Sequence, residues 1–364
     1  MLRKLAKGGM AVSMHKLGLD RLIGLGRRQQ QVPLVLSYHR VVENFERSAA
    51  HSISPMLVST ATFEAQLDWI GKHYDFVSMD EVAAAMESGA PTRRPLASVT
   101  FDDGYGDSYY HAFPILKRKG IPMGIFVVTD LVSSTHMQMH DELHLLLATG
   151  MAQWKHPTQQ LADLADLAGI EPGIRSRLCA LDLAPFARTR CALELLQYAQ
   201  LARLVTLLRD TVVVTADTLA EFHALTWDML KHMVANGVTA GSHTKSHKLL
   251  VNESYATILE ELKGSRAELE ARLGGEVRHF AFPDGRFNAD ALNGVAAAGY
   301  RYAYTTCMHR DHKYPLLTIP RRVLWENSCV DGFGRFSPSI LSCQINGIFD
   351  PATRCQQTHW ATPA

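Results

Sequence analysis

Short apolar runs and segments of helical periodicity alternate along the first third of the chain. The apolar runs predict strands, at 32–38, 76–78, 96–101 and 123–128. The periodic segments predict helices, at 61–74, 79–88 and 111–119. Strands separated by helices are typical of parallel β-α units, so an α/β fold is expected.

The alternation stops at about residue 135 and resumes after residue 224. Leucine-rich helical stretches dominate between these points, at 142–147, 161–167 and 193–208, and a strand signal occurs there only at 211–214. The resumed alternation predicts three more strands, at 237–241, 277–282 and 300–305. It also predicts helices at 227–236, 254–273 and 289–298. Residues 135–224 are therefore interpreted as a helical insertion in one α/β domain.

We divide the chain into a basic arm (1–31), an α/β domain (32–345) and a polar tail (346–364). The arm holds seven basic residues against the single acid Asp20. Such a segment can rest on an anionic membrane. It can also form a solvated helix that packs on the protein body. The second interpretation is favoured because several glycines would weaken a free-standing helix.

Composition excludes several classes of function. Lys and Arg number 37 and Asp and Glu 36, so the net charge of +1 lacks the basic footprint of a nucleic-acid-binding protein. The six cysteines form no C-x-x-C pair, which argues against a thiolate zinc site. Without a signal-peptide pattern or a long apolar run, a cytoplasmic location is expected. Peripheral contact with the inner face of the membrane would then go through the arm.

Polar clusters follow four of the predicted strands directly. They are Tyr38-His39, Asp102-Asp103, the segment 243–247 and Pro283-Asp284-Gly285. In parallel α/β folds, ligand sites form where strands end and loops begin. We therefore expect the four clusters to meet at one edge of the sheet.

The adjacent carboxylates of Asp102 and Asp103 repel each other, and burying either is costly without a compensating cation. Two imidazoles and one carboxylate suit zinc, iron or cobalt, and such a cation lowers the pKa of bound water towards about 7. One aspartate would then bind the metal and the other would act as base. The alternative, a turn that caps a following helix, is disfavoured by the pair His243 and His247.

A second histidine cluster lies in "HMQMHDELH", where His136, His140 and His144 are spaced by four residues. On a helix these side chains would share one face and could bind a metal. No strand end supports them, however, and they open the helical insertion. A role for His140 or Asp141 in shaping the substrate cleft is the preferred interpretation.

The strand-end clusters resemble known motifs. "TFDDGY" (100–105) and "SHTKSH" (242–247) are similar to the first two motifs of the polysaccharide deacetylases, the NodB-homology or carbohydrate esterase family 4. "FAFPDG" (280–285) resembles the third motif in its biofilm poly-N-acetylglucosamine deacetylase form, and "LVLSYHRV" (34–41) resembles the same subgroup. The resemblance spans about residues 32–330. It implies a distorted (β/α)7-type barrel that removes acetyl groups from N-acetylated saccharides.

The resemblance also implies roles for individual residues. It gives Asp102 as the base, His39 as the acid for the leaving amine, and the backbone N–H of Asp284 as an oxyanion donor. The implied metal ligands are Asp103, His243 and His247, with zinc as the first choice and cobalt, nickel or iron as alternatives.

Two positions depart from the family pattern. Ala281 stands where many members have an arginine that holds the catalytic aspartate, and Asp284 replaces the usual aromatic residue. No terminal Leu-x-His motif is found. His309 and His312, which follow the predicted strand 300–305, are the alternative acids.

Three other functions stay open at this point. The same scaffold could hydrolyse O-acetyl esters or other amides, including cyclic ones. A non-catalytic saccharide-binding protein is disfavoured because no implied metal ligand is lost. A protein that docks a partner through the insertion is the third. Without export signals, the expected substrate is a lipid-linked or short saccharide of exopolysaccharide or glycolipid assembly.

Overall fold

The computed structural model describes residues 2–20, 22–23, 32–180 and 183–350. The end of the predicted arm (24–31) and most of the predicted polar tail (351–364) lie outside the described residues.

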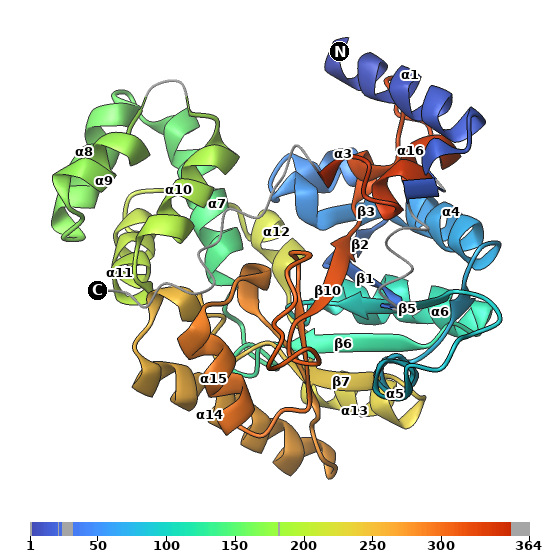
Figure 1. The fold of residues 1–364 in the computed structure, drawn as a ribbon. Coiled ribbons are helices and arrows are strands. Elements are labelled where there is room, and N and C mark those ends of the chain that lie inside the picture. The colour runs from blue at the N-terminus through green and yellow to red at the C-terminus, as the bar shows by residue number, and fades with distance from the viewer. Residues whose placement is uncertain (1, 21, 24–31, 181–182, 351–364) are drawn as a thin grey trace.

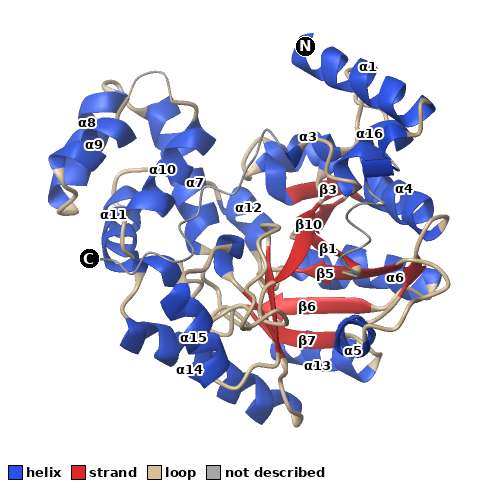
Figure 2. Ribbon diagram, viewed as in Figure 1, coloured by secondary structure: helices blue, strands red, loops and turns tan. Residues whose placement is uncertain are grey.

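Parallel strands form a closed barrel in the centre of the molecule (Figure 2). Around the barrel, β1 pairs with β10, and then follow β9, β8, β7, β6 and β5, which pairs again with β1. The strands are β1 (Leu34–Tyr38), β5 (Leu96–Phe101), β6 (Met123–Val127), β7 (Thr239–Ser242), β8 (His279–Ala281), β9 (Tyr302–Thr305) and β10 (Ile319–Val323). The short β4 (Asp75–Phe76) adds to β5. The predicted distorted (β/α)7-type barrel is thus confirmed.

Helices cover the outside of the barrel, and their apolar faces meet the strands in a core that includes Leu67, Leu262 and Phe280 or, for the helix that carries Met79 and Val82, in a separate cluster with Phe126. They are α4 (Thr60–Gly71), α5 (Met79–Ser88), α6 (Phe113–Lys119), α13 (Trp227–Ala235), α14 (Tyr255–Leu273) and α15 (Ala289–Ala297). All five residues of β6 are buried, as expected for a parallel strand covered on both faces. The predicted helices of the α/β part agree with these within a few residues.

The register of the strands sets the level at which the polar clusters emerge. Tyr38 pairs with Phe101, so the residues after β1 and β5 leave the barrel together, and the Asp102 N–H donates to the Tyr38 carbonyl (2.9 Å). Val127 of β6 pairs with Ser242 of β7, and the His243 N–H donates to the Val127 carbonyl (2.9 Å). The carboxyl edge therefore gathers these side chains on one side of the barrel.

Between β6 and β7 the chain forms helices that pack around a second hydrophobic core, which includes Leu147, Leu161 and Leu204. They are α7 (Met139–Gln153), α8 (Pro157–Leu167), α9 (Pro172–Leu178), α10 (Pro185–Leu195) and α11 (Tyr198–Arg209). The short helix α12 (Ala216–Leu219) follows them and has no residue in this core. In Figure 1, α8 and α9 lie furthest from the barrel. The helix predicted over 193–208 is two helices that meet near Leu196, and the strand predicted at 211–214 is wrong, because Val212 packs into this helical core instead.

Several elements were missed by the sequence prediction. The most consequential is β10, which closes the barrel between β9 and β1. The others are the strand pair β2 (Arg40–Val42) and β3 (Leu57–Ser59) and the helices α3 (Phe45–Ala49) and α16 (Pro338–Ile345).

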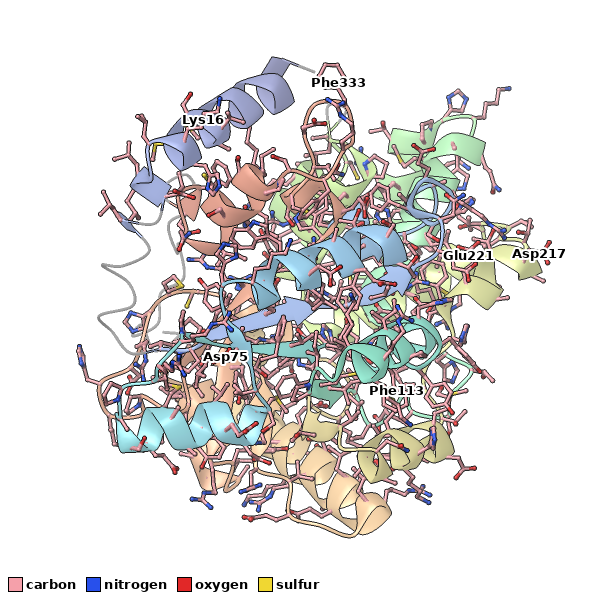
Figure 3. The ribbon with its side chains drawn as sticks, turned by 90° about the vertical axis from the view of Figure 1, so that its right-hand side faces the viewer. Lys16, Asp75, Phe113, Asp217, Glu221 and Phe333 are labelled. Carbon is pink, nitrogen blue, oxygen red and sulfur yellow. The ribbon has the colours of Figure 1, made fainter. Side chains whose placement is uncertain are left out.

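The N-terminal arm begins with the helix α1 (Leu2–Lys16), which includes Gly8 and Gly9. It packs against α16, with Ala11 buried beside Ile340 and Cys343. Figure 3 shows α1, with Lys16 labelled, at the periphery of the molecule. The contact with α16 explains why a glycine-containing segment is helical, since tertiary packing supplies most helix stability in proteins. None of the helices formed by the described residues is long and apolar enough to cross a membrane.

Candidate active site

One cavity of about 390 Å³ lies at the carboxyl edge of the barrel. The six residues to which the resemblance gives roles all line it: His39, Asp102, Asp103, His243, His247 and Asp284. They come from the ends of four strands, β1, β5, β7 and β8, and so they converge only through the topology.

Asp103 and the two histidines form a cluster with the geometry of a metal site. The Asp103 Oδ1 atom lies 3.5 Å from His243 Nε2 and 3.2 Å from His247 Nε2, and one ligand atom from each residue falls within 4.8 Å of the others. Asp103, Thr244 and His247 have positive φ angles of 70°, 69° and 59°. Left-handed backbone at non-glycine residues costs about 1–3 kcal/mol each and concentrates at functional sites.

The electrostatics of this cluster fit a cation. Both side-chain oxygens of Asp103 are buried and accept no hydrogen bond among the described residues. Burial, and next the negative charge of Asp102, raise the pKa of the Asp103 carboxyl well above its usual value. Burial also lowers the pKa of His247 well below its usual value, which favours the neutral imidazole that binds metals. A divalent cation would satisfy the orphaned carboxylate and use the free imidazole nitrogens.

Neighbouring groups orient both histidines. The His243 Nδ1–H donates to the carbonyl of Ala281 (2.8 Å), which directs Nε2 towards Asp103. Metal-binding histidines in proteins typically have such a second hydrogen bond. The backbone N–H of His247 donates to the Thr244 hydroxyl (2.9 Å), which fixes the turn between the two rings.

A buried carboxylate behind this turn was not found from the sequence. Glu261 of α14 accepts hydrogen bonds from the backbone N–H groups of Lys245 (3.0 Å) and Ser246 (2.8 Å) and from the Ser246 hydroxyl (2.7 Å). It also pairs with the ammonium of Lys248 (2.8 Å). No local pattern marks Glu261, because its contacts depend on how α14 packs beside β7. It holds the segment that carries His243 and His247.

Replacing Glu261 by alanine is expected to loosen the metal site without touching a ligand. Two backbone N–H groups would lose their acceptor, so the free energy of unfolding should fall by about 1–3 kcal/mol. Affinity for zinc should fall about tenfold, as for other groups that orient metal ligands. Urea titration and competition with a zinc chelator would measure the two effects. The exposed neighbour Glu260 is the control, and equal behaviour of the two variants would contradict this role.

Asp102 is held by an arginine that the sequence prediction missed. Arg321 of β10, whose side chain is fully buried, donates from both terminal nitrogens to the two oxygens of Asp102 (2.6 and 2.8 Å). Ser37 donates to the same carboxylate (3.0 Å). Burial alone would raise the pKa of Asp102, but the Arg321 guanidinium, together with His243 and His39, outweighs burial and the pKa falls to about 2. The function expected of an arginine at position 281 is therefore supplied from another strand.

His39 lies on the other side of Asp102. Its Nε2 atom is 3.9 Å from Asp102 Oδ2, and its Nδ1 is buried without a hydrogen-bond partner among the described residues. Burial lowers the pKa of His39 to about 4, although the Asp102 charge acts in the opposite direction. The resting imidazole is therefore neutral at neutral pH. The alternative acids His309 and His312 do not line the cavity.

The turn after β8 also reaches the cavity. Asp284 and Gly285 both have left-handed backbones, with φ of 54° and 64°, and the Asp284 carbonyl accepts from the Thr306 hydroxyl (3.2 Å). A Cβ atom on Gly285 would lie 2.4 Å from the Thr306 nitrogen, so only glycine fits there. Residues 284 and 285 of this turn both line the cavity that holds Asp103.

The histidine cluster of the insertion divides in the structure. His140 lines the cavity, with its Nε2 atom 3.8 Å from Asp103 Oδ2 and 2.9 Å from the Tyr105 hydroxyl. That hydroxyl donates to Asp141 (2.5 Å). His144 instead bonds to Thr189 inside the insertion, and His136 is exposed. Within the described residues, the only group that could hold a metal is Asp103, His243 and His247. A role for His140 in shaping the substrate cleft stays a prediction.

The insertion supplies one wall of the cavity. Phe186, Arg190, Leu193 and Glu194 of α10 and Tyr198 of α11 line it. Ile53, Pro55 and Met56, from the segment before β3, also line the cavity. The cleft thus lies between the carboxyl edge of the barrel and the helical insertion.

Comparisons with known proteins agree with this geometry. A sequence profile described as "Polysaccharide deacetylase" matches residues 89–167 and 184–303, more than half of the chain. The poly-beta-1,6-N-acetyl-D-glucosamine N-deacetylase of Staphylococcus aureus is 30% identical over 145 residues, which are 36% of this chain and 50% of that protein. The chain spans about half the length of the curated relatives it matches.

The fold is similar to two solved structures. The Streptococcus pyogenes deacetylase PplD in complex with acetate has a TM-score of 0.53 and 20% identity, covering 86% of this chain and 97% of that one. IcaB from Ammonifex degensii has a TM-score of 0.51 and 18% identity, covering 86% and 96%. Such low identities show the shared fold alone, and the family follows from the profile, which includes Asp102, Asp103, His243 and His247. The chain belongs to the polysaccharide deacetylase family.

Proposed function

We propose that this protein is a metal-dependent hydrolase that removes acetyl groups from N-acetylated saccharides. The observation that carries the proposal is that two adjacent carboxylates, Asp102 and Asp103, have different electrostatic surroundings. Asp103 is buried beside two histidines, and its oxygens accept no hydrogen bond from any described residue, whereas Asp102 is buried in an ion pair with Arg321. The surroundings of Asp103 suit metal binding, and those of Asp102 keep its carboxylate ionised beside the metal site.

Asp103, His243 and His247 would hold the metal, with zinc as the first choice because two imidazoles and a carboxylate suit it. When bound, the metal would polarise water and the acetyl carbonyl. The chain's own residues would do the rest. Asp102, fixed by Arg321 and Ser37, would orient the attacking water and accept its proton. The backbone N–H of Asp284 would donate to the developing oxyanion.

His39 is placed to finish the reaction. Its pKa of about 4 means that the resting imidazole has no proton to give at neutral pH. A carboxylate with a pKa of about 2 holds a proton only briefly, and His39 lies next to it. We therefore infer that the proton taken from water passes through Asp102 to His39, which delivers it to the departing nitrogen. The amine and acetate would then leave.

The comparisons support an N-acetylglucosamine-containing substrate, since the Staphylococcus aureus relative is named a poly-beta-1,6-N-acetyl-D-glucosamine N-deacetylase. A role in exopolysaccharide assembly is part of this proposal. The cytoplasmic location, with membrane contact through residues 1–31, stays a prediction from the sequence.

Acetate release tests the proposal directly. Chitooligosaccharides, β-1,6-linked N-acetylglucosamine oligomers and an O-acetylated sugar would be offered with zinc, cobalt or nickel, beside the Asp103→Ala variant. We expect metal-dependent release from an N-acetylated substrate. The variant should bind zinc at least about tenfold more weakly and lose that release. Release from the O-acetylated sugar alone would favour an esterase, and metal-independent release would overturn the assignment.

A further inference from the structure

The cleft holds more apolar surface than the proposed chemistry uses. Its apolar lining residues include Phe186 and Leu193 of α10, Leu249, and Ile53, Pro55 and Met56 from the segment before β3. Sugar hydroxyls need hydrogen-bond partners, and an acetyl group offers a single methyl to bury. Aliphatic side chains supply no hydrogen bonds, so this surface is suited to another part of the ligand.

Several polar side chains that line the cleft already have partners within the protein. Arg190 forms an ion pair with Glu194 one helical turn away (2.6 Å). Glu253 accepts from the backbone N–H of Tyr198 (3.4 Å), and the Tyr198 ring lies 5.2 Å from the Lys248 ammonium. What this wall offers to a ligand is therefore mainly its apolar side chains.

The apolar and chemical parts of the cleft come from different elements. The implied metal ligands, the base and the acid follow barrel strands, so the acetyl group must reach the strand ends. Phe186 and Leu193 belong to the insertion, and residues 53–56 precede β3. An apolar group in contact with these elements would be attached to the sugar and not to the carbonyl that is cleaved.

We propose that the substrate is an amphipathic glycoside, an N-acetylated sugar whose anomeric oxygen carries an apolar chain. This inference rests on the proposed function, because it assumes that the sugar binds at the strand ends. The insertion then selects the substrate, since it supplies Phe186 and Leu193. The chemical class is an alkyl- or prenyl-like chain on an N-acetylhexosamine.

Binding to metal-depleted protein separates this inference from catalysis. Calorimetry would compare the methyl, butyl and octyl β-glycosides of N-acetylglucosamine, each below the concentration at which it aggregates. Affinity should rise about fourfold per buried methylene, and at least about tenfold from methyl to octyl. Equal dissociation constants for the methyl and octyl glycosides would overturn the proposal.

Variants locate the effect in the insertion. Phe186→Ser and Leu193→Ser, made separately, should each lower the ratio of octyl to methyl affinity severalfold. Leu167→Ser is the matched control, because Leu167 belongs to the insertion but is 59% exposed and does not line the cavity. A ratio that both cleft variants leave at the wild-type value would place the chain elsewhere and overturn the assignment.

Two further arms distinguish the sources of an effect. Methyl glycosides with N-butanoyl and N-octanoyl groups test attachment of the chain through the acyl group. A gain in affinity along this series instead of the alkyl glycoside series would overturn the proposal.

Acetate release from the methyl, butyl and octyl glycosides by the zinc-loaded protein tests the chemistry. Tight octyl binding without any acetate release would overturn the proposed function and leave the apolar subsite standing.

Discussion

Replacing Asp102 by asparagine is expected to lower kcat for acetate release by about 10²–10⁴-fold while zinc stays bound. The amide keeps the shape of the carboxylate but cannot accept the proton of the attacking water. Asp102 is 3% exposed and bonded to Arg321 and Ser37, so the substitution leaves the ring of metal ligands intact. Steady-state kinetics and a zinc titration on the same preparation would check the result.

The neighbouring residue provides the matched variant. Asp103→Asn should weaken zinc binding first and lose activity as a consequence, and excess zinc should restore part of that activity. Asp102→Asn should not respond to excess zinc, because its defect lies in proton transfer. Wild-type turnover by Asp102→Asn, or equal rescue of both variants by zinc, would remove the distinction between the two aspartates.

The meeting of the four strand-end clusters could be predicted from the sequence. Each cluster directly follows an apolar run, and parallel strands in one barrel must end on the same side. The register then places Asp102 at the level of His39, since Phe101 pairs with Tyr38. Sites of this kind can be predicted from local sequence because each of these residues directly follows a strand whose position in the barrel fixes it.

Arg321 could not be found in this way. In "TIPRRV" (318–323), a proline and two arginines interrupt the apolar pattern that identifies buried strands, so β10 was missed altogether. The first three residues of the strand are nevertheless buried, because the Arg321 side chain is neutralised by Asp102. The half-buried Arg322 pairs with Asp350. The burial of Arg321 can be understood only from its partner Asp102, which lies 219 residues away along the chain.

The cluster around His140 shows the opposite case, in which a sequence pattern suggests a site that the structure does not form. The spacing of His136, His140 and His144 suggested three ligands on one helix face, but α7 begins at Met139 and leaves His136 outside it. His140 then faces the cavity while His144 bonds to Thr189 of α10. Which face a helix presents to a neighbour depends on how the two elements pack, and residue spacing alone does not specify this.

Replacing Arg321 by methionine is expected to lower the free energy of unfolding by about 3–5 kcal/mol, because it leaves the buried carboxylate of Asp102 without its partner. Total stability of a domain is only about 5–15 kcal/mol, so the loss should be plain in urea titrations. Acetate release should fall as well. Of the described side chains that donate hydrogen bonds to the Asp102 carboxylate, only Ser37 would remain to hold it in place.

Two variants test whether the loss comes from an unpaired charge. Arg322→Met changes the next residue of β10, whose partner Asp350 is partly exposed, and it should cost about 0–1 kcal/mol. The double variant Arg321→Met with Asp102→Leu removes both buried charges and should recover most of the stability without recovering activity. If the single variant is as stable as the wild type, Asp102 does not depend on Arg321 for its ionised state. If the double variant is no more stable than Arg321→Met, lost packing of the long arginine side chain would explain the effect better than charge.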